Sequence, residues 1–122
     1  MVQNKIRKID GTIFGEDVYD NDTLKVRGDK PWLLKLYVDD CRECKELTPE
    51  LKKFHEEHGD VVNVIKLNCS IPKNEEVTLF FSAYGHPMML YMLPDTDTMY
   101  KKMGFMTAKE IEEWTIGGGY KD

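Results

Sequence analysis

The stretch Leu34-Lys35-Leu36-Tyr37-Val38-Asp39-Asp40-Cys41-Arg42-Glu43-Cys44-Lys45 decides the fold. A short apolar run ends in a Cys-x-x-Cys, and residues 45–58 after it favour a helix. Two cysteines three residues apart at a helix start can close an intrachain disulfide. The unpaired backbone N–H groups and the helix dipole at that point favour a thiolate on the first sulfur. The stretch therefore predicts a site for thiol–disulfide exchange.

The bulk composition is that of an ordinary small globular domain. The chain has 122 residues, 41% of them apolar, a length that predicts one domain with a single core. The net charge is −5 and no basic face stands out, which argues against nucleic-acid binding. No segment approaches the roughly 18 apolar residues of a membrane span. Three cysteines are an odd count, which fits a redox or metal site better than a disulfide-stapled scaffold.

The first 25 residues carry charge throughout and contain no apolar segment of the kind found in a secretory signal. We therefore expect a cytoplasmic protein, while a trimmed chain would leave a secretory or periplasmic compartment open. Within one domain over residues 1–122, residues 1–30 give the weakest pattern. They predict an edge strand over residues 5–14 and a polar loop with a short helix over residues 15–29. The three glycines near the end predict a flexible tail over residues 117–122.

The rest of the chain alternates strands and helices. Strands are predicted over residues 32–38, 61–67, 88–93 and 99–105, and helices over residues 41–58, 75–83 and 108–116. Pro49 should kink the first helix and Gly59 should end it, and Thr107 with Glu110 forms a capping box for the last. Strands joined through helices pair in parallel, whereas the closely spaced last two strands form an antiparallel hairpin. The prediction is an α/β fold with a central mixed sheet flanked by helices.

This order of elements, with its punctuating residues, resembles the thioredoxin superfamily. The central strand runs into Cys41-x-x-Cys44, and Pro49 follows the second cysteine by five residues, where the family commonly has a helix-kinking proline. Gly85-His86-Pro87 precedes a strand, as the family's cis-proline loop does, and Gly104 matches a late glycine before the last helix. These landmarks span residues 31–114, about two-thirds of the chain. The resemblance implies a thioredoxin-like fold.

The resemblance also implies roles for residues of the site. Cys41 would be the nucleophile and Cys44 the resolving thiol that displaces the mixed disulfide, in agreement with the helix-terminus argument. Pro87, if cis, would place backbone polar groups opposite Cys41 to pair with a substrate chain. His86 would face the disulfide and, if protonated, favour the Cys41 thiolate; the alternative is a surface turn residue. Cys69 is interpreted as a small half-buried core residue.

Three departures from the family pattern concern the tuning of the site. Asp40 stands where thioredoxins usually carry Trp, so a carboxylate opposes the thiolate and a flat apolar docking surface is lost. Arg42 and Glu43 replace the familiar Gly-Pro or Gly-His between the cysteines and act on the thiolate in opposite directions. The carboxylates of Asp40 and Glu43 favour reduction of substrates over oxidation.

The third departure is Lys35, six residues before Cys41, where thioredoxins usually keep a buried acid for proton transfer at the resolving cysteine. A buried lysine is costly, so it should be paired, neutral, or extended to the sheet edge. Lys66 on the next strand matches the family's partner lysine. Asp39 is then the nearest carboxylate that could take over the role of the acid.

Three functions follow from these observations. The first is a thioredoxin-like oxidoreductase, a monomer with no cofactor beyond the Cys41–Cys44 disulfide, whose partners are protein disulfide substrates and a thiol reductant. The second is a thioredoxin-fold binding or chaperone module with an incidental disulfide. The third is a zinc domain using Cys41, Cys44, His55 and His58. On one helix Cys44 and His55 would lie roughly 16 Å apart, too far to share an ion, so we expect no metal site.

Overall fold

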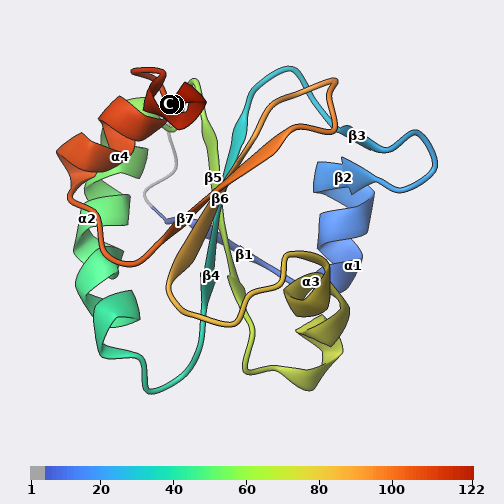
Figure 1. Cartoon of the computed structure of the whole chain (residues 1–122), viewed down its shortest axis with the longest axis horizontal. Helices are drawn as coiled ribbons and strands as arrows, with labels where there is room; N and C mark the ends of the chain where they lie inside the picture. Colours follow the sequence, from blue (N-terminus) through green and yellow to red (C-terminus); the bar gives the residue numbers. More distant parts are fainter. Residues whose placement is uncertain (1–4) are drawn as a thin grey trace.

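Strand β4 (Trp32–Tyr37) lies at the centre of a five-stranded sheet in the computed structural model, which describes residues 5–122 (Figure 1). It pairs in parallel with β5 (Asn63–Asn68) and antiparallel with β6 (Met88–Met92). The outer strands are β1 (Arg7–Ile9), parallel to β5, and β7 (Met99–Met103), antiparallel to β6. The order β1-β5-β4-β6-β7 confirms the predicted mixed sheet with its antiparallel hairpin.

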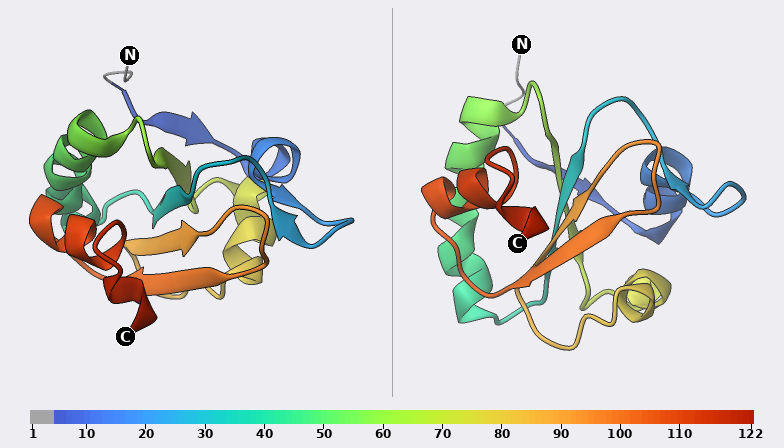
Figure 2. Two further views of the ribbon diagram at one scale, coloured as in Figure 1. Left: turned by 90° about the horizontal axis from the view of Figure 1, so that it is seen from above. Right: turned by 45° about the horizontal axis from the view of Figure 1, so that its top comes forward.

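Helices cover both faces of this sheet. Helices α2 (Arg42–His58) and α4 (Ala108–Trp114) lie on one face, and the short helices α1 (Gly11–Ile13) and α3 (Glu75–Phe80) lie on the other (Figures 1 and 2). A 3₁₀ turn, Pro72–Asn74, leads into α3. No helix within residues 5–122 has the length and apolarity needed to span a membrane. The fold is therefore three layers with β4 in the middle of the central one.

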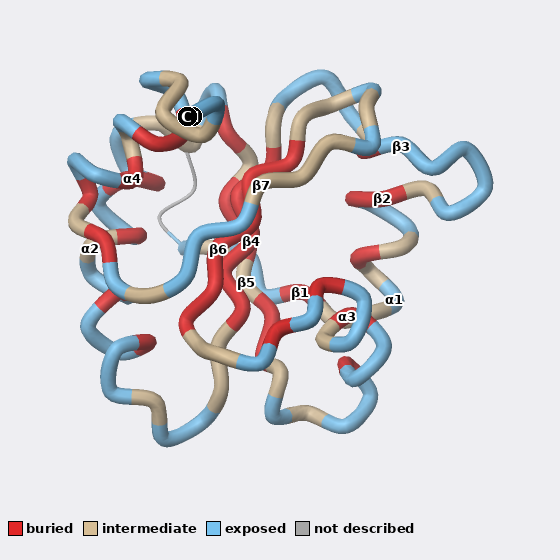
Figure 3. The backbone as a smooth tube through the Cα atoms, in the orientation of Figure 1, coloured by how far each residue is buried: buried red, intermediate tan, exposed pale blue. Residues whose placement is uncertain are grey.

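The alternation of side chains along the strands builds one apolar layer on each face. On β4, Leu34 and Leu36 join a layer with α1 and α3, whereas Leu33 packs toward α2 and α4. The buried positions in Figure 3 follow the central strands, as a sheet covered on both faces requires. The predicted apolar stripe of α2 is confirmed, since Leu47, Leu51 and Phe54 are all buried.

The cap residues explain where the helices begin and end. Cys41 is the N-cap of α2, which runs on through Pro49 and ends at Gly59. The predicted capping box of α4 is present, because the Thr107 hydroxyl accepts the Glu110 N–H while the Glu110 carboxylate accepts the Thr107 N–H. The strand predicted over residues 61–67 begins later, at Asn63, since residues 61 and 62 turn back to bond the His58 carbonyl.

The N-terminal part of the chain differs from its prediction. The strand predicted over residues 5–14 ends at Ile9, because the Asp10 carboxylate accepts the Ile13 N–H and starts α1. The region expected as a polar loop holds a π-helical turn, Phe14–Val18, and a small ribbon of β2 (Tyr19–Asp20) and β3 (Lys25–Val26). Residues 117–122, expected as a flexible tail, contain a 3₁₀ turn, Gly119–Lys121, whose Tyr120 ring packs on Tyr91 and Tyr100. Residues 1–4 of the expected domain lie outside the described part.

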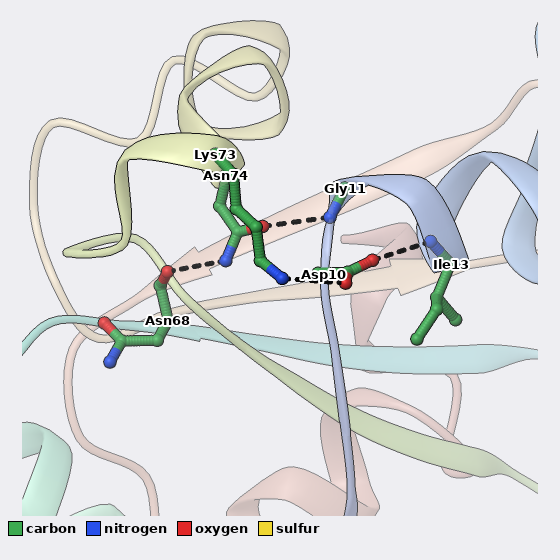
Figure 4. A network of polar contacts seen from close by, with 6 residues as sticks. All are labelled: Asp10, Gly11, Ile13, Asn68, Lys73 and Asn74. Atoms are coloured by element: carbon green, nitrogen blue, oxygen red, sulfur yellow. Dashed lines mark hydrogen bonds and ion pairs between the residues drawn. The ribbon is translucent and has the colours of Figure 1, made fainter.

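A buried amide joins α3 to the sheet and to α1. Asn74 is 1% exposed; its side chain accepts the Gly11 N–H at 2.9 Å and donates to the Asn68 carbonyl at 2.9 Å (Figure 4). An exposed ion pair between Lys73 and Asp10 crosses the same gap. The amide supplies the side-chain partner of the partly buried Gly11 N–H and adds a shorter bond to the Asn68 carbonyl, which also accepts the Ile71 N–H at 3.4 Å. It therefore joins the start of α3 to the chain after β1 and to the end of β5.

One lysine is buried in the α2 face of the sheet. The Lys35 side chain points between β4 and α2 and only 4% of the residue is exposed. Its ammonium donates to the Cys44 carbonyl at 3.0 Å and to the Thr48 hydroxyl at 3.1 Å. Burial, together with the like charge of Lys66 in register on β5, lowers the Lys35 pKa from 10.5 to about 8. The charged form of Lys35 therefore destabilises the folded protein.

Replacement of Lys35 by Met should stabilise the protein near pH 7. A pKa lowered in the folded state means that the ammonium destabilises the fold below about pH 8. This destabilisation decreases as the pH rises from about 8 toward 10.5, because the amine loses its charge.

The Lys35→Met variant leaves the Cys44 carbonyl with a partner, because the Thr48 hydroxyl also donates to that oxygen. We expect Lys35→Met to raise the free energy of unfolding near pH 7 by about 1–3 kcal/mol, with the gain shrinking toward pH 10. Urea unfolding across this range measures it, with the exposed Lys53→Met as control; a destabilised variant with no such pH dependence would contradict the argument.

Replacement of Asn74 by Ala should weaken the attachment of α3. The variant removes the partner of the Gly11 N–H, leaves the Asn68 carbonyl with only the longer bond from the Ile71 N–H, and opens a small cavity. We expect a loss of about 2–4 kcal/mol. Thermal and urea unfolding of Asn74→Ala measure the loss. The matched control is the exposed Asn21→Ala, which we expect to change stability by less than about 0.5 kcal/mol. Equal effects at the two positions would show that the buried amide is not what holds α3.

Candidate active site

The disulfide between Cys41 and Cys44 lies at the N-terminal end of α2, with 5.2 Å between the two Cα atoms. Cys41 is half-buried at the cap position, whereas Cys44, one turn into the helix, is only 3% exposed. The Cys44 backbone N–H donates to the Cys41 sulfur at 3.2 Å. A negative charge on that sulfur would therefore be stabilised both by a directed N–H group and by the helix dipole. This arrangement agrees with Cys41 as the attacking thiol.

The joint between β4 and α2 holds the first cysteine in place. Asp40 is exposed and has a left-handed backbone, with φ of 57°, a conformation that Asp tolerates better than most residues. Before it, the Asp39 N–H donates to the Ser70 hydroxyl at 2.8 Å, and the Asp39 carboxylate accepts from the Asn68 amide at 3.1 Å. The Asp39 carboxylate is thus bound by the end of β5. The side chains that bond the Cys44 carbonyl are those of Lys35 and Thr48 instead.

The proline loop lies against the disulfide. The His86–Pro87 peptide bond is cis, and the Cys41 sulfur is 3.7 Å from the His86 carbonyl oxygen. Pro87 is buried, and its carbonyl accepts the Gly104 N–H at 2.8 Å. Gly104 has φ of 89°, which glycine adopts without strain, so this landmark of the sequence has a conformational reason. The loop and the end of β7 therefore form the wall opposite Cys41.

The imidazole of His86 contributes differently from its backbone. Burial lowers the His86 pKa, and within the described chain its buried Nε2 atom has no hydrogen-bond partner. Burial therefore favours the neutral imidazole in this disulfide-bonded form and opposes the protonated state that would favour a Cys41 thiolate. It is the His86 carbonyl that lies beside the sulfur.

The two residues between the cysteines point to solvent. The Arg42 guanidinium pairs with the Glu46 carboxylate one turn along α2, at 3.0 Å, so its charge is largely compensated there. Glu43 is exposed. Together with Asp40, Glu43 leaves carboxylates on the solvent side of Cys41.

On the other side of the disulfide, a cleft of about 380 Å³ reaches from solvent to Cys44. Lys35, Lys66 and Thr48 line it, and Asp39 and Asp40 stand at the rim near the end of β4. Sequence reasoning did not identify Thr48. The spacing is the signal that could have done so, since a residue four positions after Cys44 lies on the same face of a helix.

The remaining candidates lie away from this site. His55 and His58 are at the far end of α2, where His58 approaches Glu112 at 3.3 Å, and within residues 5–122 no three His, Cys, Asp or Glu side chains are grouped to hold a metal ion. Cys69 is half-buried at the end of β5, and burial raises its thiol pKa. This is the core role predicted for it.

Comparison with known proteins agrees with this geometry. The thioredoxin family model matches residues 12–116. The chain is 35% identical over 87 residues to a thioredoxin of Alicyclobacillus acidocaldarius subsp. acidocaldarius, covering 71% of this chain and 80% of that protein. It is 26% identical over 93 residues to protein disulfide-isomerase 2-3 of Arabidopsis thaliana, covering 76% of this chain and 21% of that longer protein.

Solved structures give the same fold. Chloroplastic thioredoxin z superposes with a TM-score of 0.76 at 23% identity, covering 99% of this chain and 97% of that one. Thioredoxin f2 of Chlamydomonas reinhardtii superposes with a TM-score of 0.72 at 22% identity, covering 90% of this chain and 94% of that one. The chain belongs to the thioredoxin family, and its Cys41–Cys44 disulfide is the redox pair typical of that family's oxidoreductases.

Proposed function

We propose that this protein exchanges its Cys41–Cys44 dithiol and disulfide with the disulfides of protein substrates, acting as a reductase. Cys41 attacks one substrate sulfur as a thiolate and forms a mixed disulfide; Cys44 then attacks the Cys41 sulfur and releases the reduced substrate. A thiol reductant returns the Cys41–Cys44 pair to the dithiol. The single observation that carries the proposal is the half-exposed Cys41 sulfur at the α2 N-terminus, bonded by the Cys44 N–H and facing the His86 carbonyl.

Exposed apolar side chains beside the proline loop support a polypeptide substrate. Tyr84 is 86% exposed two residues before His86, and Met103 and Phe105 are exposed on either side of Gly104. Met103 also covers Gly85, where an added Cβ would overlap its methyl group. These side chains supply the apolar surface that Asp40 removes on the other side of Cys41. An extended peptide could then pair with the His86 carbonyl while resting on them.

The carboxylates on the solvent side of Cys41 support the reductase direction. Strong oxidants of this class owe their potential to a stabilised thiolate in the reduced form. Asp40 and Glu43 are exposed close to Cys41 in the chain, and Arg42 is paired with Glu46. With Lys45 as the remaining cation beside Asp40, the residues around the first cysteine contribute more negative than positive charge. This charge lowers the stability of the dithiol form and makes it a better electron donor.

Catalytic turnover distinguishes the oxidoreductase from the alternative of a binding module. With dithiothreitol as electron donor, the protein should accelerate insulin reduction, and Cys41→Ser should lose at least about 100-fold of that acceleration because it lacks the nucleophile. Precipitation of the reduced insulin B chain measures the rate. Cys69→Ser is the matched control and should keep the activity. Wild-type turnover no faster than that of Cys41→Ser would favour a binding module.

The order of the two cysteines is tested by trapping. Cys44→Ser should accumulate a mixed disulfide with a protein substrate through Cys41, since the thiol that resolves it is missing. Cys41→Ser should accumulate little, because Cys44 is buried. Non-reducing electrophoresis with mass spectrometry of the linked peptides identifies the cysteine involved. A complex linked through Cys44 in the Cys41→Ser variant, formed as readily, would reverse the assignment.

A further inference from the structure

The buried side chain of Lys35 lies next to Cys44, and its role is inferred here on the basis of the proposed function. Lys35 Nζ lies 3.0 Å from the Cys44 carbonyl oxygen, and both residues line the cleft described above. On the sheet, Lys35 is flanked in register by Lys66 on β5 and by the apolar Met89 on β6. Lys45 and Lys66 also line this cleft, and Lys35 is the one of the three lysines whose amine bonds the carbonyl of the resolving cysteine.

The hydrogen bonds of Nζ match a neutral amine. Its hydrogen-bond partners are the Cys44 carbonyl and the Thr48 hydroxyl, at 3.0 and 3.1 Å, and no carboxylate pairs with it within the described chain. An ammonium has three N–H groups to donate, and beyond these two partners it meets only the Tyr37 ring, whose centroid is 5.4 Å from Nζ. A neutral amine has two N–H groups and one lone pair. With both N–H groups engaged, its lone pair is left to accept a proton.

The charges around Nζ make the neutral form accessible. Burial and the Lys66 ammonium lower the Lys35 pKa to about 8. About a tenth of the molecules would therefore carry the neutral amine near pH 7, against fewer than about one in a thousand for an exposed lysine. The groups that border the same cleft are Tyr37, Asp39 and Asp40 at the end of β4, Lys66 on β5, and Cys44, Lys45 and Thr48 on α2. The Asp39 carboxylate among them is engaged by Asn68.

We propose that Lys35 accepts the proton of the Cys44 thiol when the mixed disulfide on Cys41 is resolved. The amine takes that proton and becomes an ammonium, and the Cys44 thiolate attacks the Cys41 sulfur. The bond between Cys41 and the substrate sulfur breaks, and its electron pair leaves on the substrate as a thiolate, which is protonated by solvent. The ammonium then returns its proton to solvent through the cleft. The cysteine pair is oxidised by two electrons and the substrate disulfide has been reduced by two.

The reaction with one equivalent of 5,5′-dithiobis(2-nitrobenzoate) separates the two steps. In a Cys69→Ser background, attack by Cys41 releases the first thionitrobenzoate in a second-order phase. Resolution by Cys44 releases the second in a first-order phase, and stopped-flow absorbance follows both. We expect Lys35→Met and Lys35→Arg to slow the second phase about 100-fold near pH 7 and to leave the first phase largely unchanged. Arginine keeps the positive charge but cannot accept a proton, so it distinguishes a base from a fixed charge.

Each outcome of this experiment supports or overturns the proposed role of Lys35. A normal second phase in Lys35→Arg with a slow one in Lys35→Met would assign a purely electrostatic effect and overturn the proposal. Normal second phases in both variants would overturn it as well. The exposed Lys53→Met is the control and should leave both phases unchanged. Absence of the first phase in the parent protein would be a failure of the proposed function itself, distinct from a failure at Lys35.

A second measurement keeps the proposal testable if the variants do not fold. The Cε carbon of Lys35 in ¹³C-lysine-labelled wild-type protein reports the titration of the amine by NMR. A midpoint near pH 8, well below that of Lys53, supports the proposal. Titration of Lys35 together with the exposed lysines would overturn it, because the neutral amine would then be too rare to act.

Discussion

The strand-to-helix joint at residues 38–41 is the constraint on which the rest of the structure depends. β4 is held between β5 and β6 and buried on both faces, so its end is fixed in space. Asp39 ties that end to Asn68 and Ser70, and the left-handed backbone of Asp40 turns the chain so that Cys41 becomes the N-cap of α2. The first sulfur thereby receives the Cys44 N–H, and the second is carried one turn inward.

The two sulfurs consequently occupy different environments. Cys41 is half-buried with the His86 carbonyl beside its sulfur, and its near neighbours in the chain, Asp40 and Glu43, are exposed. Cys44 is buried, and the Lys35 amine bonds its backbone carbonyl and the Thr48 hydroxyl on the same helix. The Lys35 pKa is lowered by the burial that the central strand imposes. One feature of the fold thus destabilises the chain and, under our proposal, supplies the base for Cys44. Such a trade between stability and activity is common at functional sites.

The sequence was sufficient for the architecture from residue 31 onward. Apolar runs, the Cys-x-x-Cys and its proline and glycine landmarks predicted the mixed sheet, and the family comparisons and β-pairing confirm it. The first 30 residues were predicted poorly, because the π-helical turn and the two-residue strands β2 and β3 have no periodicity of their own. They depend on distant partners: the Phe14 and Tyr19 rings pack on Phe80 of α3, and Val26 of β3 bonds the backbone of residues 95 and 96. At the site, the sequence identified Lys35 as an anomaly. The hydrogen-bond partners of Lys35 could not be predicted from the sequence, because the contact to Thr48 depends on how α2 crosses β4.

Alkylation of the reduced protein as a function of pH tests the difference between the two cysteines most directly. The helix N-terminus should lower the pKa of the Cys41 thiol relative to that of Cys44. Brief exposure to iodoacetamide, followed by mass spectrometry of the peptides containing each cysteine, measures the two rates separately. The structure predicts that Cys41 is modified first and at a lower pH than a free thiol, with Cys44 slower at every pH. Equal rates at the two cysteines, or faster modification of Cys44, would contradict it.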